Sequence, residues 1–243
     1  MARVAVQAVA VAAGAAYLAA LLALDHYASY PQQLALGALT IVVFVAALTR
    51  VSVERRAQAV GVVVFATIGE VIGSLIWGVY SYRLHNLPLF VPPAHGLVYL
   101  TGLALATALV RHTRVLVWTA AAGAVTWGVL GLTVLPHRDI AGALGIPMLL
   151  LFLWRGRNRA IYAGVFLVVA ALELYGTAIS TWRWADELPG LGIPQGNPPS
   201  GVASGYVWFD VMALLTAPRA LHMIRRRLDG DAATQPSSFP NSR

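Results

Sequence analysis

The chain has 243 residues, of which 58% are hydrophobic and only 11% are charged. Soluble domains have roughly 45–50% apolar and roughly 25% charged residues, so this composition excludes an ordinary water-soluble globule. The chain contains no cysteine and all 17 basic residues are arginine, which excludes disulfide scaffolds, cysteine nucleophiles, and Schiff-base or P-loop lysines.

Eight long apolar stretches follow one another along the chain. A helix that crosses a membrane needs about 20 mostly apolar residues. We therefore expect an all-α, polytopic membrane protein with spans near residues 4–24, 32–49, 59–82, 91–110, 115–135, 140–154, 160–181 and 200–222. The first stretch is too long for a cleaved signal peptide. The sixth is short and contains Pro147, which predicts a kinked span.

The arginines lie in short clusters between these stretches, which is typical of a membrane protein and argues against a nucleic-acid partner. Fourteen fall on one side of the eight spans, and three, Arg83, Arg138 and Arg183, fall on the other. Because cytoplasmic loops carry the positive excess, both termini are predicted to be cytoplasmic in a multi-pass protein of the plasma membrane. One transmembrane domain should occupy residues 1–228, and residues 229–243 should form a disordered cytoplasmic tail.

The two halves of the chain share a short pattern. Glu70-Val71-Ile72-Gly73-Ser74 in the third span matches Glu173-Leu174-Tyr175-Gly176-Thr177 in the seventh, and each is followed by aromatic residues and a proline pair. This predicts two repeated four-helix units, about 1–114 and 115–228. The third and seventh spans would then be pseudo-equivalent, and a site between the halves would open on the non-cytoplasmic side.

Three carboxyl groups lie near the middle of predicted spans, namely Glu70, Glu173 and Asp210. A charge at the bilayer centre costs about 2.5–3.5 kcal/mol, so such residues are usually paired, protonated or functional. One interpretation is a neutral carboxyl that only hydrogen-bonds a neighbouring helix. The other is a protonated carboxyl that acts as a general acid.

His95 and a set of aromatic residues fall near the same ends of the spans. His95 is interpreted either as a helix cap or as a proton relay beside Glu70, and a metal site is not expected because no Glu-x-x-His spacing occurs. At 100° per residue, Glu70, Trp77 and Tyr80 share one helix face. The aromatics fit a membrane-interface belt or a pocket that stabilises a cation. The predicted substrate-binding residues are Trp77, Tyr80, Trp182, Trp184, Tyr206 and, from a Gly/Pro-rich loop, Asn197.

One stretch resembles known families. Between Gly69 and Leu100 the chain carries Glu70, Gly73, Trp77, Tyr80, Tyr82 and Leu87-Pro88-Leu89-Phe90-Val91-Pro92. This order resembles the membrane carotenoid hydratases and is similar to the membrane-integral lycopene cyclases, although the Pro-x-Glu-Glu signature of the cyclases is absent. The resemblance covers about 30 residues in each half. It implies acid-initiated chemistry on an isoprenoid double bond, with Glu70 as the acid.

The leading hypothesis is therefore a membrane enzyme that hydrates or cyclises a lipophilic isoprenoid or carotenoid without a soluble cofactor. In that hypothesis Glu70, Glu173, Asp210 and His95 carry the catalysis. A proton-coupled transporter is the alternative, since parallel repeats also occur in transporters. A third possibility is a non-catalytic assembly subunit in which the glutamates only hold helices together. The partners expected are the bilayer and the lipophilic substrate, and no oligomeric state follows from the sequence.

Overall fold

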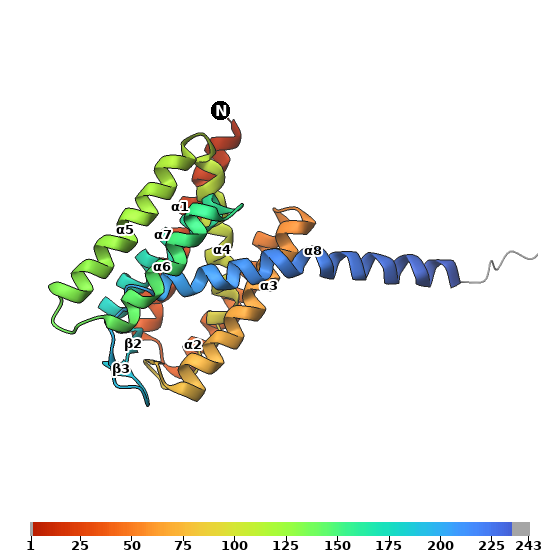
Figure 1. Cartoon of the computed structure of the whole chain (residues 1–243). Coiled ribbons are helices and arrows are strands. Elements are labelled where there is room, and N and C mark those ends of the chain that lie inside the picture. The colour runs from red at the N-terminus through yellow and green to blue at the C-terminus, as the bar shows by residue number, and fades with distance from the viewer. Residues whose placement is uncertain (1, 235–243) are drawn as a thin grey trace, which may run out of the picture.

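The computed structural model describes the backbone of residues 2–234 and the side chains of residues 4–224 and 226. Within this part of the chain, eight α-helices form the bundle shown in Figure 1. They are α1 (Ala2–Tyr27), α2 (Tyr30–Thr49), α3 (Val53–Glu70), α4 (Val91–Ala108), α5 (Thr113–Thr133), α6 (Ile140–Arg155), α7 (Arg159–Ala178) and α8 (Val202–Thr234). A π-helical turn, η1 (Val71–Trp77), continues α3, and a 3₁₀ turn, η2 (Val110–His112), joins α4 to α5.

Six of the described helices are long and apolar enough to cross a membrane. The two others explain why the prediction of eight spans is correct only in part. α6 has 16 residues, which at 1.5 Å per residue is shorter than the roughly 30 Å hydrocarbon core. α4 begins with Pro92, Pro93 and His95 and is mostly buried inside the bundle. The chain is thus a multi-pass membrane protein in which α4 is largely covered by other helices.

Short polar residues start several of these helices. At the start of α2, Ser29 forms a capping box with Gln32. The Ser52 hydroxyl accepts a hydrogen bond from the Arg55 backbone N–H and begins α3. Asp139 does the same for α6 through the backbone N–H of Gly142. These caps satisfy donors that the first turn of a helix leaves free.

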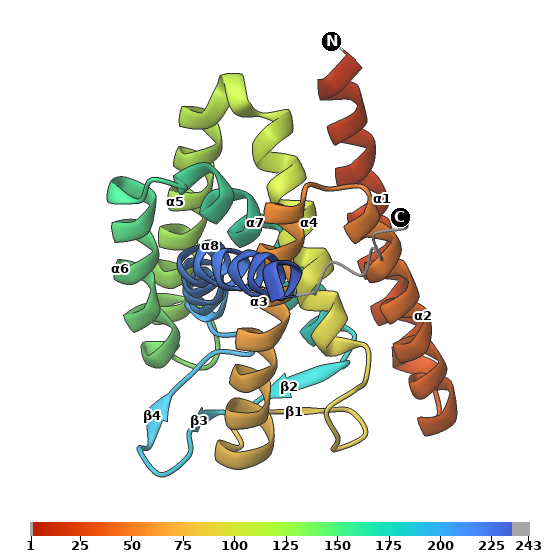
Figure 2. The ribbon, with the colours of Figure 1, turned by 90° about the vertical axis from the view of Figure 1, so that its right-hand side faces the viewer.

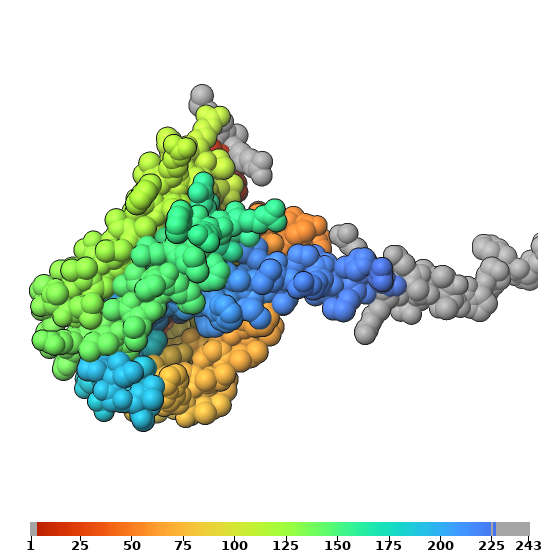
Figure 3. Space-filling model, viewed as in Figure 1, coloured from red at the N-terminus to blue at the C-terminus, as the bar shows by residue number. Residues whose placement is uncertain are grey.

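The centre of the bundle consists of α3, α4, α7 and α8. α3 packs against α8 and α4, and α7 packs against α4 and α8, so each half of the chain supplies two central helices. α4 and α7 lie very close together at Gly102 and Gly164. A Cβ atom on Gly164 would be only 2.3 Å from the Gly102 carbonyl oxygen, so the close approach requires glycine there. Figure 2 looks along α8, and in Figure 3 the same helix runs between the α6–α7 region and α3.

A small β-ribbon closes one end of the central helices. β1 (Tyr80–Tyr82) pairs antiparallel with β2 (Trp182–Trp184), with Tyr80 opposite Trp184 and Tyr82 opposite Trp182. The ribbon therefore has a local two-fold arrangement about the Ser81–Arg183 pair. A second ribbon joins β3 (Glu187–Leu188) to β4 (Ile193–Pro194) in the following loop. The spans predicted at 59–82 and 160–181 end earlier than expected, because η1 stops at Trp77 and α7 at Ala178.

The C-terminal helix extends beyond the bundle (Figure 1). α8 continues to Thr234, past residue 228, where the sequence predicts the start of a tail. The rest of that predicted tail, residues 235–243, lies outside the described residues.

Candidate functional site

A mostly apolar cavity of about 300 Å³ lies beneath the β1–β2 ribbon. Residues of α1, α3, α4, α7, α8 and both strands line it, so the cavity draws on both halves of the chain. Leucines of α1 and Phe90, Val169 and Phe209 supply apolar wall. The polar groups at its surface include Glu70, His95 and Glu173.

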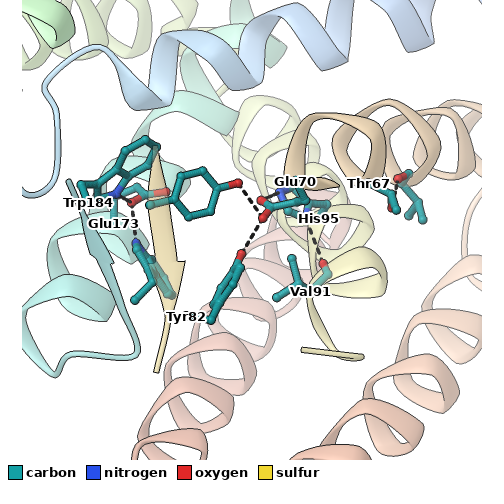
Figure 4. Close-up of polar contacts among 10 residues, drawn as sticks. Thr67, Glu70, Tyr82, Val91, His95, Glu173 and Trp184 are labelled. Atoms are coloured by element: carbon teal, nitrogen blue, oxygen red, sulfur yellow. Dashed lines mark hydrogen bonds and ion pairs between the residues drawn. The ribbon is translucent and has the colours of Figure 1, made fainter. Parts of the chain in front are cut away.

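Glu70 lies where α3 changes into the π-helical turn. Such π-turns occur frequently at functional sites because they re-aim the side chains around them. The hydroxyls of Tyr80 and Tyr82 both donate to Glu70 Oε2, each at 2.7 Å (Figure 4). The residue is only 6% exposed. One carboxylate oxygen is therefore fixed by two hydroxyls of the ribbon, and the other faces α4.

His95 of α4 faces that second oxygen. Its Nδ1 lies 2.9 Å from the Val91 carbonyl oxygen, and a carbonyl only accepts, so Nδ1 carries a hydrogen and donates it. Its Nε2 lies 3.3 Å from Glu70 Oε1. The ring also stacks on Tyr206 of α8, with centroids 5.2 Å apart. Glu70 and His95 therefore form a buried carboxylate–imidazole pair, and a proton held on either facing atom would lie between them.

Glu173 of α7 binds the other strand of the ribbon. Its Oε2 accepts hydrogen bonds from the indole N–H groups of Trp182, at 2.9 Å, and Trp184, at 3.2 Å (Figure 4). Gly176 makes room for this arrangement, because a Cβ atom there would lie 2.1 Å from the Trp182 ring. Indole groups only donate, so they hold an acceptor oxygen of Glu173 in place at the cavity wall.

Burial raises the pKa of Tyr80 and Tyr82, and the adjacent Glu70 carboxyl raises both further. Both hydroxyls therefore keep their protons at neutral pH. They remain donors to Glu70 throughout the range in which His95 and carboxyl groups ordinarily titrate.

Three predicted site residues do not line the cavity. Asp210 of α8 is 1% exposed, and its Oδ2 has no hydrogen-bond partner among the described residues. Trp77 is 45% exposed, and its Nε1 donates to the Pro189 carbonyl oxygen instead. Asn197 accepts a hydrogen bond from the Trp184 backbone N–H, so it positions that residue from outside the cavity.

The expectation that Trp77 and Tyr80 share a helix face with Glu70 is wrong for a geometric reason. It assumed 100° per residue, whereas the turn from Val71 is π-helical and winds more loosely. Gly78 then adopts φ +75°, which ends the helix. Tyr80 still reaches Glu70, but from a strand that folds back beneath it.

Sequence reasoning missed two buried acids, Asp139 and Asp25. The Asp139 carboxylate accepts backbone N–H groups of Gly142, Gly196 and Ser200, at 3.0, 2.8 and 2.5 Å. It thereby fixes the loop that leads into α8. Its place at the start of an apolar helix was a detectable capping signal, but its contacts in the later loop were not.

Asp25 lies at the end of α1, beside the ribbon. Its carboxylate accepts a hydrogen bond from Gln33 Nε2 at 2.8 Å, and its carbonyl oxygen accepts one from Arg83 at 2.6 Å. Arg83 also donates to the Ala28 carbonyl oxygen, so it ties the loop after β1 to the α1–α2 turn.

Among the residues with described side chains, no group of three or more His, Cys, Asp or Glu could hold a metal ion. Comparisons with protein-family models, curated proteins and solved structures find no match. The resemblance to carotenoid hydratases and cyclases therefore stays a prediction, and the site must be interpreted from its own chemistry.

Proposed function

We propose that the protein is an intramembrane enzyme that adds a proton to a double bond of a lipophilic, isoprenoid-like substrate. The observation that carries this proposal is the buried Glu70–His95 pair, whose facing atoms lie 3.3 Å apart at the wall of a mostly apolar cavity. A buried acid next to an apolar binding space is the arrangement that general-acid chemistry on a hydrocarbon requires.

The proposed reaction divides the work between the two glutamates. The Glu70–His95 pair gives its proton to one alkene carbon, which leaves a cation at the other carbon. Aromatic faces and the Glu173 carboxylate stabilise that cation. In a hydration, water forms a C–O bond to the cation and releases a proton to Glu173, so alkene and water become an alcohol. In a cyclisation, an internal alkene forms the new C–C bond, which moves the cation to another carbon, and a neighbouring C–H bond then breaks and gives its proton to Glu173, leaving a new double bond.

The size of the cavity limits what can enter it. Since one water occupies about 30 Å³ in the liquid, a volume of about 300 Å³ holds a group of roughly ten non-hydrogen atoms. That matches one end of a long isoprenoid rather than a whole C40 chain. The rest of such a substrate would lie outside the cavity, along the apolar helices.

Expression in a host that accumulates linear carotenoids tests the proposal. The pigments are separated and their masses are measured by mass spectrometry. We expect hydrated or cyclised products with the wild type and none with Glu70→Gln, which cannot donate the proton. Glu187→Gln is the matched control, because Glu187 lies exposed in β3. Unchanged pigments with both the wild type and Glu70→Gln would contradict a carotenoid substrate.

A proton-coupled transporter is the second candidate, because the Glu70–His95 pair and Glu173 face one cavity between two interlocked halves. It predicts substrate uptake into proteoliposomes that depends on a pH gradient and is uncoupled by Glu173→Gln. A purely structural role predicts instead that Glu70→Gln and Glu173→Gln lower thermal stability and change nothing else.

A further inference from the structure

The cavity beneath the ribbon is less covered on the side formed by α8. Its lining leucines on α1, and most of its lining residues on α4 and α7, are buried. The four lining residues of α8 are all half-buried, namely Val202, Gly205, Tyr206 and Phe209. They recur every three or four residues, so they form one stripe along the helix. The cavity is therefore least covered along this stripe.

Gly205 lies at the edge of that stripe. At about 100° per residue, it is about 60° around the helix from Trp208, and the other three lining residues are each about 100° or more from Trp208. Trp208 is 50% exposed and marks the outer face of α8. A Cβ atom on Gly205 would lie within 4 Å of no described atom outside its own stretch of helix. Gly205 thus lines the cavity where the inner and outer faces of α8 meet.

The neighbouring helix leaves this place open. α3 contacts α8 at Gly69, where a Cβ atom would lie 2.6 Å from the Phe209 ring. One turn closer to the ribbon, the three atoms nearest to a Cβ atom on Gly73 would all belong to Tyr80, and a Cβ atom on Gly205 would meet nothing. α3 and α8 therefore touch as far as Phe209 and separate beyond it. We call the space between η1 and Gly205 the side opening.

Apolar side chains surround the side opening on the outside of the bundle. Ile72 and Ile76 of η1 and Trp208 and Leu215 of α8 are between 48% and 74% exposed. In a membrane bundle, apolar outer faces of this kind contact lipid chains. A hydrocarbon chain can pass between them without losing hydrogen bonds to water, whereas a polar molecule cannot.

We propose that the side opening admits one hydrocarbon chain from the bilayer into the cavity, and that Gly205 leaves the space through which the chain passes. The end of the chain then lies beside Glu70 and Glu173, and the rest lies outside, between η1 and α8. The inference rests on the proposed function only in taking the ligand to be lipophilic, and it names the route by which that ligand reaches the acid. Gly205 determines which ligands enter and takes no part in the proton transfer.

Labelling of a thiol inside the cavity tests this route, because the chain has no cysteine of its own. Val169 of α7 lines the cavity and is 1% exposed, so the Val169→Cys variant places a single thiol there. The variant is placed in lipid nanodiscs with N-dodecylmaleimide, which dissolves in the bilayer, or with a sulfonated maleimide, which stays in water. The intact mass of the protein measures the rate at which each reagent adds to the thiol.

We expect the dodecyl reagent to label Val169→Cys, and the sulfonated reagent to label it only after denaturation. Adding Gly205→Leu should slow the dodecyl labelling about tenfold or more, because the passing chain then overpacks the opening. Gly123→Leu is the matched control, since Gly123 is exposed on α5 and a Cβ atom there would lie 3.9 Å from its nearest neighbour.

A methyl-branched reagent of the same chain length, N-farnesylmaleimide, identifies the source of the chain. Faster labelling than with the dodecyl reagent indicates an isoprenoid. Equal or slower labelling indicates that the opening also admits the straight acyl chains of lipids.

An unchanged rate in Gly205→Leu, or equal slowing in Gly123→Leu, would overturn the route. So would a thiol that the dodecyl reagent reaches only after denaturation. If Gly205→Leu does not fold, Phe209→Ala decides the outcome: loss of the ring beside Gly69 should speed the labelling, and an unchanged rate would contradict the route. The labelling needs no reaction product, so a wrong substrate class fails only in the pigment assay and a wrong route fails only here.

Discussion

Glu70 and Glu173 follow the same short pattern in the two halves, yet their neighbours differ. Glu70 accepts hydrogen bonds from two tyrosine hydroxyls and faces His95, whereas Glu173 accepts hydrogen bonds from the indole N–H groups of two tryptophans. Hydroxyl and imidazole groups exchange protons readily, while an indole N–H acts as a fixed donor. The two glutamates therefore lie in chemically different surroundings, and the proposed function assigns the proton release to Glu70.

Tyr82 makes a prediction about alkaline pH. Burial raises its pKa above the unfolded value of about 10, so the folded protein binds that proton more tightly. Its contribution to stability is present below about pH 10 and falls by about 1.4 kcal/mol for each further pH unit. Unfolding in detergent between neutral and strongly alkaline pH measures this slope. In Tyr82→Phe, stability should fall less steeply with pH above about pH 10, because the contribution of Tyr82 to the slope is gone. An identical slope in the variant would contradict the prediction.

Asp139 makes a prediction about stability. Asp139→Ala leaves three backbone N–H groups without their acceptor, each worth about 1–3 kcal/mol when buried. We expect a loss of about 3 kcal/mol or more, with faster proteolysis between Gly196 and Ser200. Asp186→Ala serves as control because Asp186 forms an exposed pair with Arg183. Equal thermal stability of the two variants would show that Asp139 does not hold the loop.

At the scale of elements, the cavity depends on how closely the central helices approach. α4 and α7 meet at Gly102 and Gly164, where a Cβ atom on either residue would contact backbone atoms of the other helix. Backbone cannot rotate away as a side chain can, so these positions set the distance between the helices. α4 carries His95 and α7 carries Glu173, and the same contact therefore sets the width of the site.

Gly164→Ala should thus destabilise the protein by about 1–3 kcal/mol, the usual cost of overpacking, and push α4 away from α7. Thermal unfolding in detergent measures the change. Gly123→Ala in α5 is the matched control, because its Cβ atom would meet nothing closer than 3.9 Å. Alanine there should leave stability unchanged or raise it slightly, through better helix propensity. A similar loss in both variants would indicate general glycine sensitivity instead.

At the scale of the whole molecule, the two halves are interlocked rather than placed side by side. α3 packs on α8 and α4 packs on α7, and the ribbon joins one strand from each half. Neither half encloses the cavity alone, because Glu70 and His95 come from one half and Glu173 from the other.

This arrangement predicts the behaviour of a divided chain. Residues 1–110 and 111–243, produced together as two polypeptides, should copurify, since the break falls in an exposed turn and leaves all central contacts intact. Either piece produced alone should aggregate or be degraded, because it exposes the face that its partner covers. Size-exclusion chromatography in detergent distinguishes these outcomes. A single piece that is monodisperse and folded would contradict the interlocked arrangement.

Composition and local pattern alone determine much of this protein. The scarcity of charge and the long apolar stretches specify a helical membrane bundle, since a bilayer leaves backbone groups no partner outside a helix or a closed barrel. The Glu-x-x-Gly repeat likewise identifies Glu70 and Glu173, because a carboxyl group inside an apolar stretch is costly enough to be conspicuous.

Only the tertiary structure decides which of these acids meet. Helical periodicity placed Trp77 beside Glu70, but the π-turn and Gly78 turn Trp77 outward and bring Tyr80 and Tyr82 in from a strand. Depth in a span could not separate Asp210 from the two glutamates, because depth says nothing about which face of α8 points to the cavity. The pairing of Glu70 with His95 likewise arises from a contact between helices, which no local pattern encodes.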